Sequence, residues 1–290
     1  MKIDGKTRTC GLIGNPVEHT LSPVIHNNLA DMLGMNLTYV PFLVEEEGLD
    51  RAVEGAYELN ILGMNVTVPY KSAVIKSLKE IDELAEKIGA VNTLVRCEGG
   101  YKGYNTDMSG LFRAMQTEGI RVKDETVLLL GAGGAARAVA FLCCQCGAKK
   151  IYICNRTMEK AQEVAMEIRE RAEFDKITAI KYEDIAELPG DKFLAIQCTS
   201  VGLHPNVTDV VLADGPVYDR IHTGVDLIYR PYETQFMKLV KAHDGKTMNG
   251  LKMLLYQGII AYELWNGCDV TEEQAGGILQ KMKEELGIYE

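Results

Sequence analysis

The sequence contains no long hydrophobic segment. Nowhere do the roughly eighteen uncharged apolar residues that indicate a membrane-spanning helix follow one another, so we expect no transmembrane helix. The amino-terminal stretch MKIDGKTRTC has no apolar core followed by a small-residue cleavage site, so we expect no secretory signal. These absences predict a cytoplasmic protein.

An excess of basic residues is also absent. Lysine and arginine total 31 against 41 aspartate and glutamate residues, which gives a formal net charge of −10. Nucleic acids and anionic membranes bind proteins through a basic surface, so neither is expected as a partner. An anionic small molecule must instead be held by local cations, amides and hydroxyls that overcome this unfavourable field.

The eight cysteines show no spacing typical of a disulfide framework in a chain of this length. Cys143, Cys144 and Cys146 lie close together, but within an apolar helical stretch, AVAFLCCQC, and without a second cysteine or histidine pair at zinc spacing. Buried cysteine commonly packs as a small hydrophobic residue. We expect reduced thiols and no bound metal.

A chain of 290 residues is long enough for two domains. The first part alternates strand and helix patterns as βαβαβ, which favours a mostly parallel sheet. A hairpin and a further helix follow. The predicted strands are 9–14, 37–44, 60–68, 91–97 and 101–105, and the helices are 22–33, 49–59 and 107–118.

A second α/β pattern begins near residue 126, where an apolar strand leads through a glycine-rich turn into a helix that ends near Gly147. The connections between the two domains are expected near Asp107 and near Gly250. The remaining predicted strands are 151–154, 176–180, 193–199 and 224–229, and the helices are 158–172, 233–243, 251–265 and 271–286.

The glycine-rich turn fits the dinucleotide-binding pattern G-x-G-x-x-[G/A] in its required strand-to-helix context. Gly131 permits the tight turn, Gly133 lets the backbone approach a pyrophosphate, and the small Ala136 allows close packing of helix on strand. The alternative is a plain strand-to-helix turn. The turn consists of Gly131, Ala132, Gly133, Gly134, Ala135 and Ala136.

The next strand ends in Asn155, Arg156 and Thr157, where NAD-binding folds normally supply an acid for the ribose 2′-hydroxyl. No acid stands there. Arg156 offers a guanidinium to a 2′-phosphate, and Lys160 adds a second positive charge one helical turn on. This favours NADP as cofactor. The alternative is an exposed helix start capped by Asn155 or Thr157 with incidental basic residues.

Several separate motifs, in order along nearly the whole chain, resemble those of the shikimate dehydrogenase family. They are GNPVEHTLSP (14–23) followed by His26-Asn27, NVTVPYK (65–71), GAVNT (89–93), GYNTD (103–107), the GAGGA turn with NRT (155–157), and the late Tyr229 and Gln257.

The resemblance implies two α/β domains with a cleft between them: a substrate-binding domain of residues 1–106, completed by the helices of 251–290, and a Rossmann-type NADP-binding domain of residues 107–250. The implied activity is the interconversion of 3-dehydroshikimate and shikimate by hydride transfer, in aromatic amino-acid (chorismate) biosynthesis. The implied ligands are NADP and a small carboxylated ring.

Oxidation of an alcohol by hydride transfer requires its hydroxyl proton to leave, and a partly desolvated lysine can accept that proton. The resemblance assigns this role to Lys71, with Asp107 holding the ammonium and the substrate hydroxyl in line. The alternative treats Lys71 as a surface residue at a helix start and Asp107 as the N-cap of the helix after Thr106.

The same resemblance implies further contacts. Hydroxyls of Thr20 and Ser22 bind the ring carboxylate, and Thr199, Leu227 and Gly250 lie near the nicotinamide. Alternatives exist here too: Ser22 as an N-cap before Pro23, Tyr229 as packing, and Gln257 as an exposed helix residue. The other residues implied to bind ring hydroxyls or the carboxylate are Thr67, Asn92, Tyr229 and Gln257.

Three residues depart from the family pattern. Thr20 stands where most members have serine, Met108 replaces the glycine after NTD, which implies a bulkier cleft floor, and Cys198 replaces an asparagine. The phrases MLLYQG and ELWNG resemble the quinate/shikimate branch, whereas NRT departs from the cofactor motif of its NAD-using members.

Two other functions are considered. One is a quinate/shikimate dehydrogenase with relaxed substrate or cofactor use, which Thr20 supports. The other is a binding protein without turnover, which the presence of both Lys71 and Asp107 disfavours. The sequence leaves open whether the protein is a monomer or a homodimer, and which reaction direction is physiological.

Overall fold

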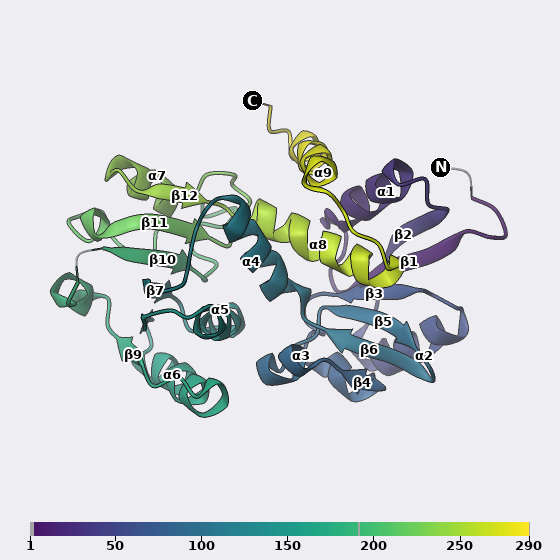
Figure 1. Ribbon diagram of the computed structural model, residues 1–290, viewed down its shortest axis with the longest axis horizontal. Coiled ribbons are helices and arrows are strands. Elements are labelled where there is room, and N and C mark those ends of the chain that lie inside the picture. The colour runs from purple at the N-terminus through teal and green to yellow at the C-terminus, as the bar shows by residue number, and fades with distance from the viewer. Residues whose placement is uncertain (1–2, 191, 290) are drawn as a thin grey trace. The chain divides into compact units, whose positions relative to one another are not determined.

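The structure is a computed structural model, and it describes residues 3–190 and 192–289 (Figure 1). The chain divides into two compact units, Met1–Gly110 with Leu254–Glu290 and Leu111–Met253. The unit boundaries fall within helices α4 (Thr106–Thr117) and α8 (Leu251–Asn266). The boundaries predicted from the sequence lie at the beginnings of these same two helices.

The first unit contains a six-stranded sheet in the order β2-β1-β3-β5-β6-β4. Strand β5 runs antiparallel to both neighbours, whereas the other pairings are parallel. The sheet is thus mostly parallel, as predicted. Its strands are β1 (Arg8–Gly14), β2 (Leu37–Leu43), β3 (Gly63–Val66), β4 (Glu80–Ile81), β5 (Thr93–Cys97) and β6 (Gly100–Tyr104), and the unit's helices besides α4 and α8 are α1 (Ser22–Met32), α2 (Leu49–Glu58), α3 (Glu83–Ile88) and α9 (Glu272–Glu285).

The second unit contains a fully parallel six-stranded sheet in the order β12-β11-β10-β7-β8-β9. This is the Rossmann order, with its topological switch point between β7 and β10. The strands are β7 (Thr126–Leu130), β8 (Lys150–Cys154), β9 (Ile177–Ile180), β10 (Phe193–Gln197), β11 (Ile221–Asp226) and β12 (Lys246–Met248), and the helices are α5 (Gly134–Gln145), α6 (Met158–Ala172) and α7 (Gln235–Ala242).

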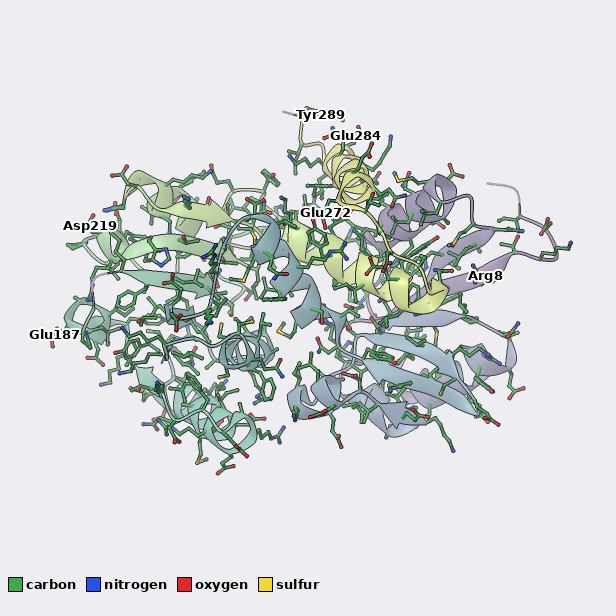
Figure 2. The ribbon with its side chains drawn as sticks, viewed as in Figure 1. Arg8, Glu187, Asp219, Glu272, Glu284 and Tyr289 are labelled. Atoms are coloured by element: carbon green, nitrogen blue, oxygen red, sulfur yellow. The ribbon has the colours of Figure 1, made fainter. Side chains whose placement is uncertain are left out.

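Each unit has an apolar core because strands in parallel sheets are covered on both faces. In the first unit Ile13, Val66 and Leu94 pack with Tyr101. In the second, Leu128, Leu130 and Ala195 pack with Phe236 on one face of the sheet. Charged side chains such as Glu187, Asp219 and Glu284 are exposed (Figure 2).

Short stretches of regular structure differ from the sequence predictions. Strand β11 begins at Ile221 and ends at Asp226, three residues earlier at each end than predicted. Strands β4 and β12 were not predicted, because two or three residues carry too little periodicity to be seen. Within the described residues, short 3-10 helices also join longer elements: Glu46–Gly48, Ala73–Ser77, Glu183–Glu187 and Tyr218–Arg220.

Candidate active site

One edge of the first unit's sheet collects polar residues from distant parts of the sequence. Strands β3 and β6 end at this edge, and β5 begins there because it runs antiparallel to both. Residues that follow β3 and β6 therefore meet the residue that precedes β5. Thr67 and Lys71 follow β3, Asp107 follows β6, and Asn92 immediately precedes β5.

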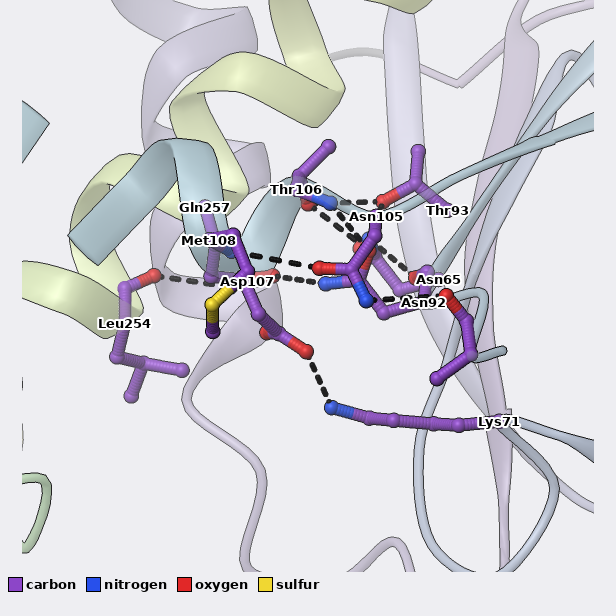
Figure 3. Close-up of polar contacts among 11 residues, drawn as sticks. Asn65, Lys71, Asn92, Thr93, Asn105, Thr106, Asp107, Met108, Leu254 and Gln257 are labelled. Atoms are coloured by element: carbon purple, nitrogen blue, oxygen red, sulfur yellow. Dashed lines mark hydrogen bonds and ion pairs between the residues drawn. The ribbon is translucent and has the colours of Figure 1, made fainter. Parts of the chain in front are cut away.

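Lys71 and Asp107 form an ion pair at this edge (Figure 3). The Lys71 Nζ lies 2.6 Å from Asp107 Oδ2, and the two side chains are 34% and 19% exposed. Helix α4 begins at Thr106, and the Asn105 Oδ1 accepts a hydrogen bond from the Met108 amide at 3.3 Å. Asn105 therefore caps the helix. The N-cap interpretation of Asp107 is wrong, and its carboxylate is available to Lys71.

Asn92 is held in one orientation by its neighbours. Its Oδ1 accepts hydrogen bonds from the Thr106 amide at 2.7 Å and from the hydroxyls of Thr93 and Thr106, both at 3.2 Å. Its Nδ2 faces Gln257 Oε1 at 3.4 Å (Figure 3). Gln257 is 7% exposed, so its interpretation as an exposed helix residue is wrong. Neutral amide groups thus lie beside the charged pair.

The two predicted carboxylate-binding hydroxyls lie in the loop after β1 and at the first residue of α1. The Thr20 hydroxyl donates to the Ser22 hydroxyl at 3.2 Å and accepts from the Ser22 amide at 3.2 Å. Helix α1 has Leu21 as its N-cap and no side-chain cap bond, so Ser22 is not an N-cap. Thr67 lies beside the start of this loop, because a Cβ added to Gly14 would come within 2.3 Å of the Thr67 methyl.

In the second unit the glycine-rich turn follows β7. Gly131 has φ +118°, which favours glycine, and a Cβ there would lie 2.8 Å from the Thr199 methyl. Gly133 is the N-cap of α5, whose first turn contains no acidic residue. Apart from the chain neighbours and the backbone of the helix itself, no atom of the described residues lies within 4 Å of a Cβ built on Gly133 or Gly134. The start of α5 is therefore open beside these two glycines, and the first amides of a helix have no partner within the helix, so this end suits a phosphate.

The cations predicted to bind a 2′-phosphate follow β8, the strand next to β7. Arg156 and Lys160 are both exposed. Thr157 is the N-cap of α6 but makes no side-chain cap bond. The Asn155 Nδ2 donates to the Thr157 carbonyl at 2.9 Å, which orders the turn. Neither side chain therefore caps the helix, contrary to the alternative interpretation.

The residues predicted to lie near the nicotinamide follow β10, β11 and β12. A Cβ on Gly250 would lie 2.0 Å from the Leu227 carbonyl oxygen, and the Gly250 amide donates to the Ile228 carbonyl at 3.0 Å. Only glycine fits this contact. Tyr229 is half-buried in the same segment, and this burial raises the pKa of its phenol. Tyr229 belongs to the second unit, unlike the other predicted substrate contacts.

The buried carboxylate of Asp226, which was not predicted from the sequence, joins these segments by hydrogen bonds. The Asp226 Oδ1 accepts from the Ile228 amide at 2.9 Å and from Gln197 Nε2 at 3.4 Å, and Oδ2 accepts from the Thr234 hydroxyl at 2.6 Å. The Gln197 Oε1 accepts from the Thr199 amide. Burial raises the pKa of Asp226 to about 6. The sequence feature that could have indicated this residue is an isolated acid within the apolar run GVDLIY.

Comparison with known proteins gives the family. One family model, the shikimate dehydrogenase substrate binding domain, matches residues 12–94, and another, shikimate / quinate 5-dehydrogenase, matches residues 113–200. A shikimate dehydrogenase (NADP(+)) from Desulforamulus reducens is 42% identical over 285 residues, covering 97% of each chain. The chain belongs to the shikimate dehydrogenase family.

Solved structures agree with this family assignment. A shikimate dehydrogenase in complex with NADP+ has a TM-score of 0.90 at 37% identity, covering 100% of this chain and 98% of the other. A quinate dehydrogenase from Corynebacterium glutamicum in complex with NAD has a TM-score of 0.86 at 26% identity, covering 96% of this chain and 99% of the other. The two-domain α/β fold, with a substrate-binding and a Rossmann-like domain, is therefore that of the family.

The three departures from the family pattern differ in exposure. Met108 is 3% exposed and Cys198 is 9% exposed, so both side chains are packed inside the protein, whereas Thr20 is half-buried. All eight cysteines are free thiols. Within residues 3–190 and 192–289, no group of three or more histidine, cysteine, aspartate or glutamate side chains is placed to hold a metal ion. In the same ranges, no helix combines the length and apolar character needed to cross a membrane.

Proposed function

We propose that the protein catalyses the NADP-dependent interconversion of 3-dehydroshikimate and shikimate in aromatic amino-acid (chorismate) biosynthesis. The observation that carries this proposal is the Lys71–Asp107 pair at 2.6 Å, on the sheet edge where the first unit's neutral donors gather. NADPH, when bound, supplies the hydride. Residues of the chain bind the ring, orient it and exchange protons with it.

In the direction of ketone reduction, the Lys71 ammonium donates a proton to the ketone oxygen as the carbonyl carbon is reduced. Asp107 holds the ammonium in position and accepts a hydrogen bond from the substrate hydroxyl. Because the Lys71 side chain is 34% exposed, solvent can return the proton to its amine. In the opposite direction the amine accepts the hydroxyl proton.

The rest of the substrate site uses neutral groups. The hydroxyls of Thr20 and Ser22 bind the ring carboxylate, and the Asn92 Nδ2 binds a ring hydroxyl. Neutral donors need no compensating charge in a protein with a net charge of −10. The remaining proposed substrate contacts are Thr67, Tyr229 and Gln257.

The second unit holds the cofactor. The free amides at the start of α5 bind the pyrophosphate, and the Arg156 guanidinium binds the 2′-phosphate as a planar fork with Lys160 as a second cation. Thr199, Leu227 and Gly250 line the nicotinamide end. Support comes from the open space beside Gly133 and from the exposed position of Arg156.

A second candidate function is quinate/shikimate dehydrogenation with relaxed cofactor use. It is supported by Thr20, whose hydroxyl is proposed to bind the ring carboxylate, and by the structural likeness to a quinate dehydrogenase in complex with NAD. Purified protein assayed with shikimate and quinate, each against NADP and NAD, separates the two functions. We expect shikimate with NADP to give the highest kcat/KM. Comparable values with quinate or NAD would favour the second candidate, and no turnover would contradict both.

The cytoplasmic location stays a prediction from the sequence, and the choice between monomer and homodimer stays open. Light scattering on the purified protein measures its oligomeric state.

A further inference from the structure

Helix α1 carries two residues of the amino-terminal motif, His26 and Asn27, that have no place in the proposed binding set. Both act on Tyr39 of strand β2. The Asn27 Oδ1 accepts from the Tyr39 amide at 2.8 Å, and its Nδ2 donates to the Tyr39 carbonyl at 3.1 Å, as a neighbouring strand would. The His26 ring stacks on the Tyr39 ring with centroids 4.2 Å apart. The pair therefore fixes Tyr39 in the sheet.

His26 and Tyr39 converge on Asn65 of strand β3. The Tyr39 hydroxyl donates to Asn65 Oδ1 at 2.8 Å, and His26 Nε2 lies 3.2 Å from the same oxygen. The Asn65 Nδ2 donates to the Asn92 carbonyl at 3.3 Å, which fixes the orientation of the Asn65 amide because a carbonyl only accepts. His26 Nε2 must therefore carry the proton. Burial lowers the pKa of His26 to about 3, so the ring is neutral.

The fixed Asn65 amide acts in turn on Thr93. Its Nδ2 also donates to the Thr93 hydroxyl at 3.1 Å. The Thr93 oxygen lies 3.2 Å from Asn92 Oδ1 and 3.0 Å from the Thr106 hydroxyl. The Thr93 hydroxyl, together with the amide and hydroxyl of Thr106, saturates the Oδ1 acceptor of Asn92. Its Nδ2 donates one proton to Gln257 Oε1 at 3.4 Å and keeps its second proton for a ligand.

We propose that His26, Tyr39, Asn65 and Thr93 are positioning residues that hold Asn92 with its Nδ2 directed at a ring hydroxyl of the substrate. This inference rests on the proposed function, in which Asn92 binds that hydroxyl.

The histidine itself supports a positioning role. Its Nδ1 is buried and has no hydrogen-bond partner among the described residues, which costs stability. A phenylalanine would keep the stacking on Tyr39 without that cost. What only the histidine provides is the Nε2 proton directed at Asn65, and this proton holds the amide that orients Thr93 and Asn92.

Tyr39→Phe tests the inference because it removes one hydroxyl and keeps the ring. Because this change removes one hydrogen bond, we expect the KM for shikimate to rise by about three- to tenfold. The kcat is expected to stay within about twofold, because the Asn92 contact is made equally in the ground and transition states. The KM for NADP should not change.

Tyr101→Phe is the matched control. Tyr101 is also a buried tyrosine of the first unit, and its hydroxyl donates to the Ile61 carbonyl at 2.7 Å, away from Asn92. This variant should lose thermal stability but keep both KM values. If Tyr39→Phe does not fold, Thr93→Val removes the next hydroxyl of the series and is expected to give the same rise in the KM for shikimate.

A double-mutant cycle with Asn92→Ala decides whether the effect passes through Asn92. We expect Tyr39→Phe to raise the KM for shikimate in the wild-type background but not in the Asn92→Ala background. Equal effects in both backgrounds, or a Tyr39→Phe variant that behaves like Tyr101→Phe, would overturn the inference while the proposed function stands. Absence of turnover in the wild type would overturn the proposed function and the inference with it.

Discussion

The two units differ in which charged side chains they bury and which they expose. In the first unit the buried polar side chains around Asn92 are neutral, and the charged pair Lys71–Asp107 stays partly exposed at the sheet edge. In the second unit a carboxylate, Asp226, is completely buried at the end of β11, while Arg156 lies exposed after β8. The difference follows from what each unit has to hold.

In the proposed function, amides and hydroxyls bind a ring with hydroxyl groups, and the first unit needs charge only at the Lys71–Asp107 pair, where a proton moves. The second unit must hold two chain segments that leave neighbouring strands, β10 and β11. Asp226 does this because its two oxygens accept from Gln197, Ile228 and Thr234 together. A buried charge is costly unless it is hydrogen-bonded, and three donors offset part of that cost.

Removal of the Lys71 charge should have the largest effect on activity. Lys71→Ala is expected to lower kcat by about 10²- to 10⁴-fold, the usual contribution of general acid–base catalysis. The affinity for NADPH should be kept, because the proposed cofactor contacts lie in the second unit. Steady-state kinetics and NADPH fluorescence titration measure the two quantities.

Lys76→Ala is the control for this change, because Lys76 is an exposed lysine of the same unit paired with Asp50 at 3.0 Å. Its kcat should match the wild type. A Lys71→Ala variant with near-normal turnover would remove Lys71 from the mechanism.

The buried charge of the second unit should affect stability through pH. The pKa of Asp226 is about 6 in the folded protein against an ordinary value of 3.8. Between these values the unfolded chain has lost the proton that the folded chain keeps, so the wild type loses stability as pH rises from about 4 to about 6. The loss is about 3 kcal/mol, at ~1.4 kcal/mol for each pKa unit.

Asp226→Asn removes this ionisation. The free energy of unfolding, measured by urea titration at pH 4 and pH 7, should therefore fall by about 3 kcal/mol more in the wild type than in the variant. The comparison isolates Asp226 because the other titrating groups are common to both proteins. Equal pH dependence in the two proteins would show that Asp226 keeps an ordinary carboxylate pKa.

A smaller effect, on the preference for NADP over NAD, is expected from removal of the Arg156 charge. Arg156→Ala should weaken NADP and leave NAD nearly unchanged, because only NADP carries the 2′-phosphate. A charge-assisted hydrogen bond contributes about 1.5–3 kcal/mol, which predicts roughly a 10- to 150-fold loss of preference in the ratio of kcat/KM values. Lys160→Ala should cause a smaller loss. An unchanged ratio, or a wild type that already prefers NAD, would contradict the 2′-phosphate assignment.

Most of the fold was predictable because its signals are local. Apolar runs at 126–130 and 193–197 become fully parallel central strands, and the glycine-rich turn lies where its pattern placed it. The displaced end of β11 was not predictable from periodicity. The apolar residues Leu227 and Ile228 continue the strand pattern, but the hydrogen bonds of Asp226 end the strand before them.

The candidate site was predictable in its residues but not in its connections. The motifs placed Lys71, Asn92 and Asp107, and the structure brings them to one sheet edge. That Asn105 caps α4 and so frees Asp107 depends on the conformation at the helix start. The bonds from Tyr39 and His26 to Asn65 join strands and a helix far apart in the sequence, and no local pattern indicates them.

The role of the Lys71–Asp107 pair is tested most directly by the turnover of Asp107→Asn, measured together with its melting temperature. Asp107 is 2.6 Å from Lys71 and is not the helix cap, so the variant should lose kcat by about 10²-fold or more and show a raised KM for shikimate. Its melting temperature should stay close to that of the wild type. Normal kcat with a lowered melting temperature would contradict the account and assign Asp107 to the stability of helix α4.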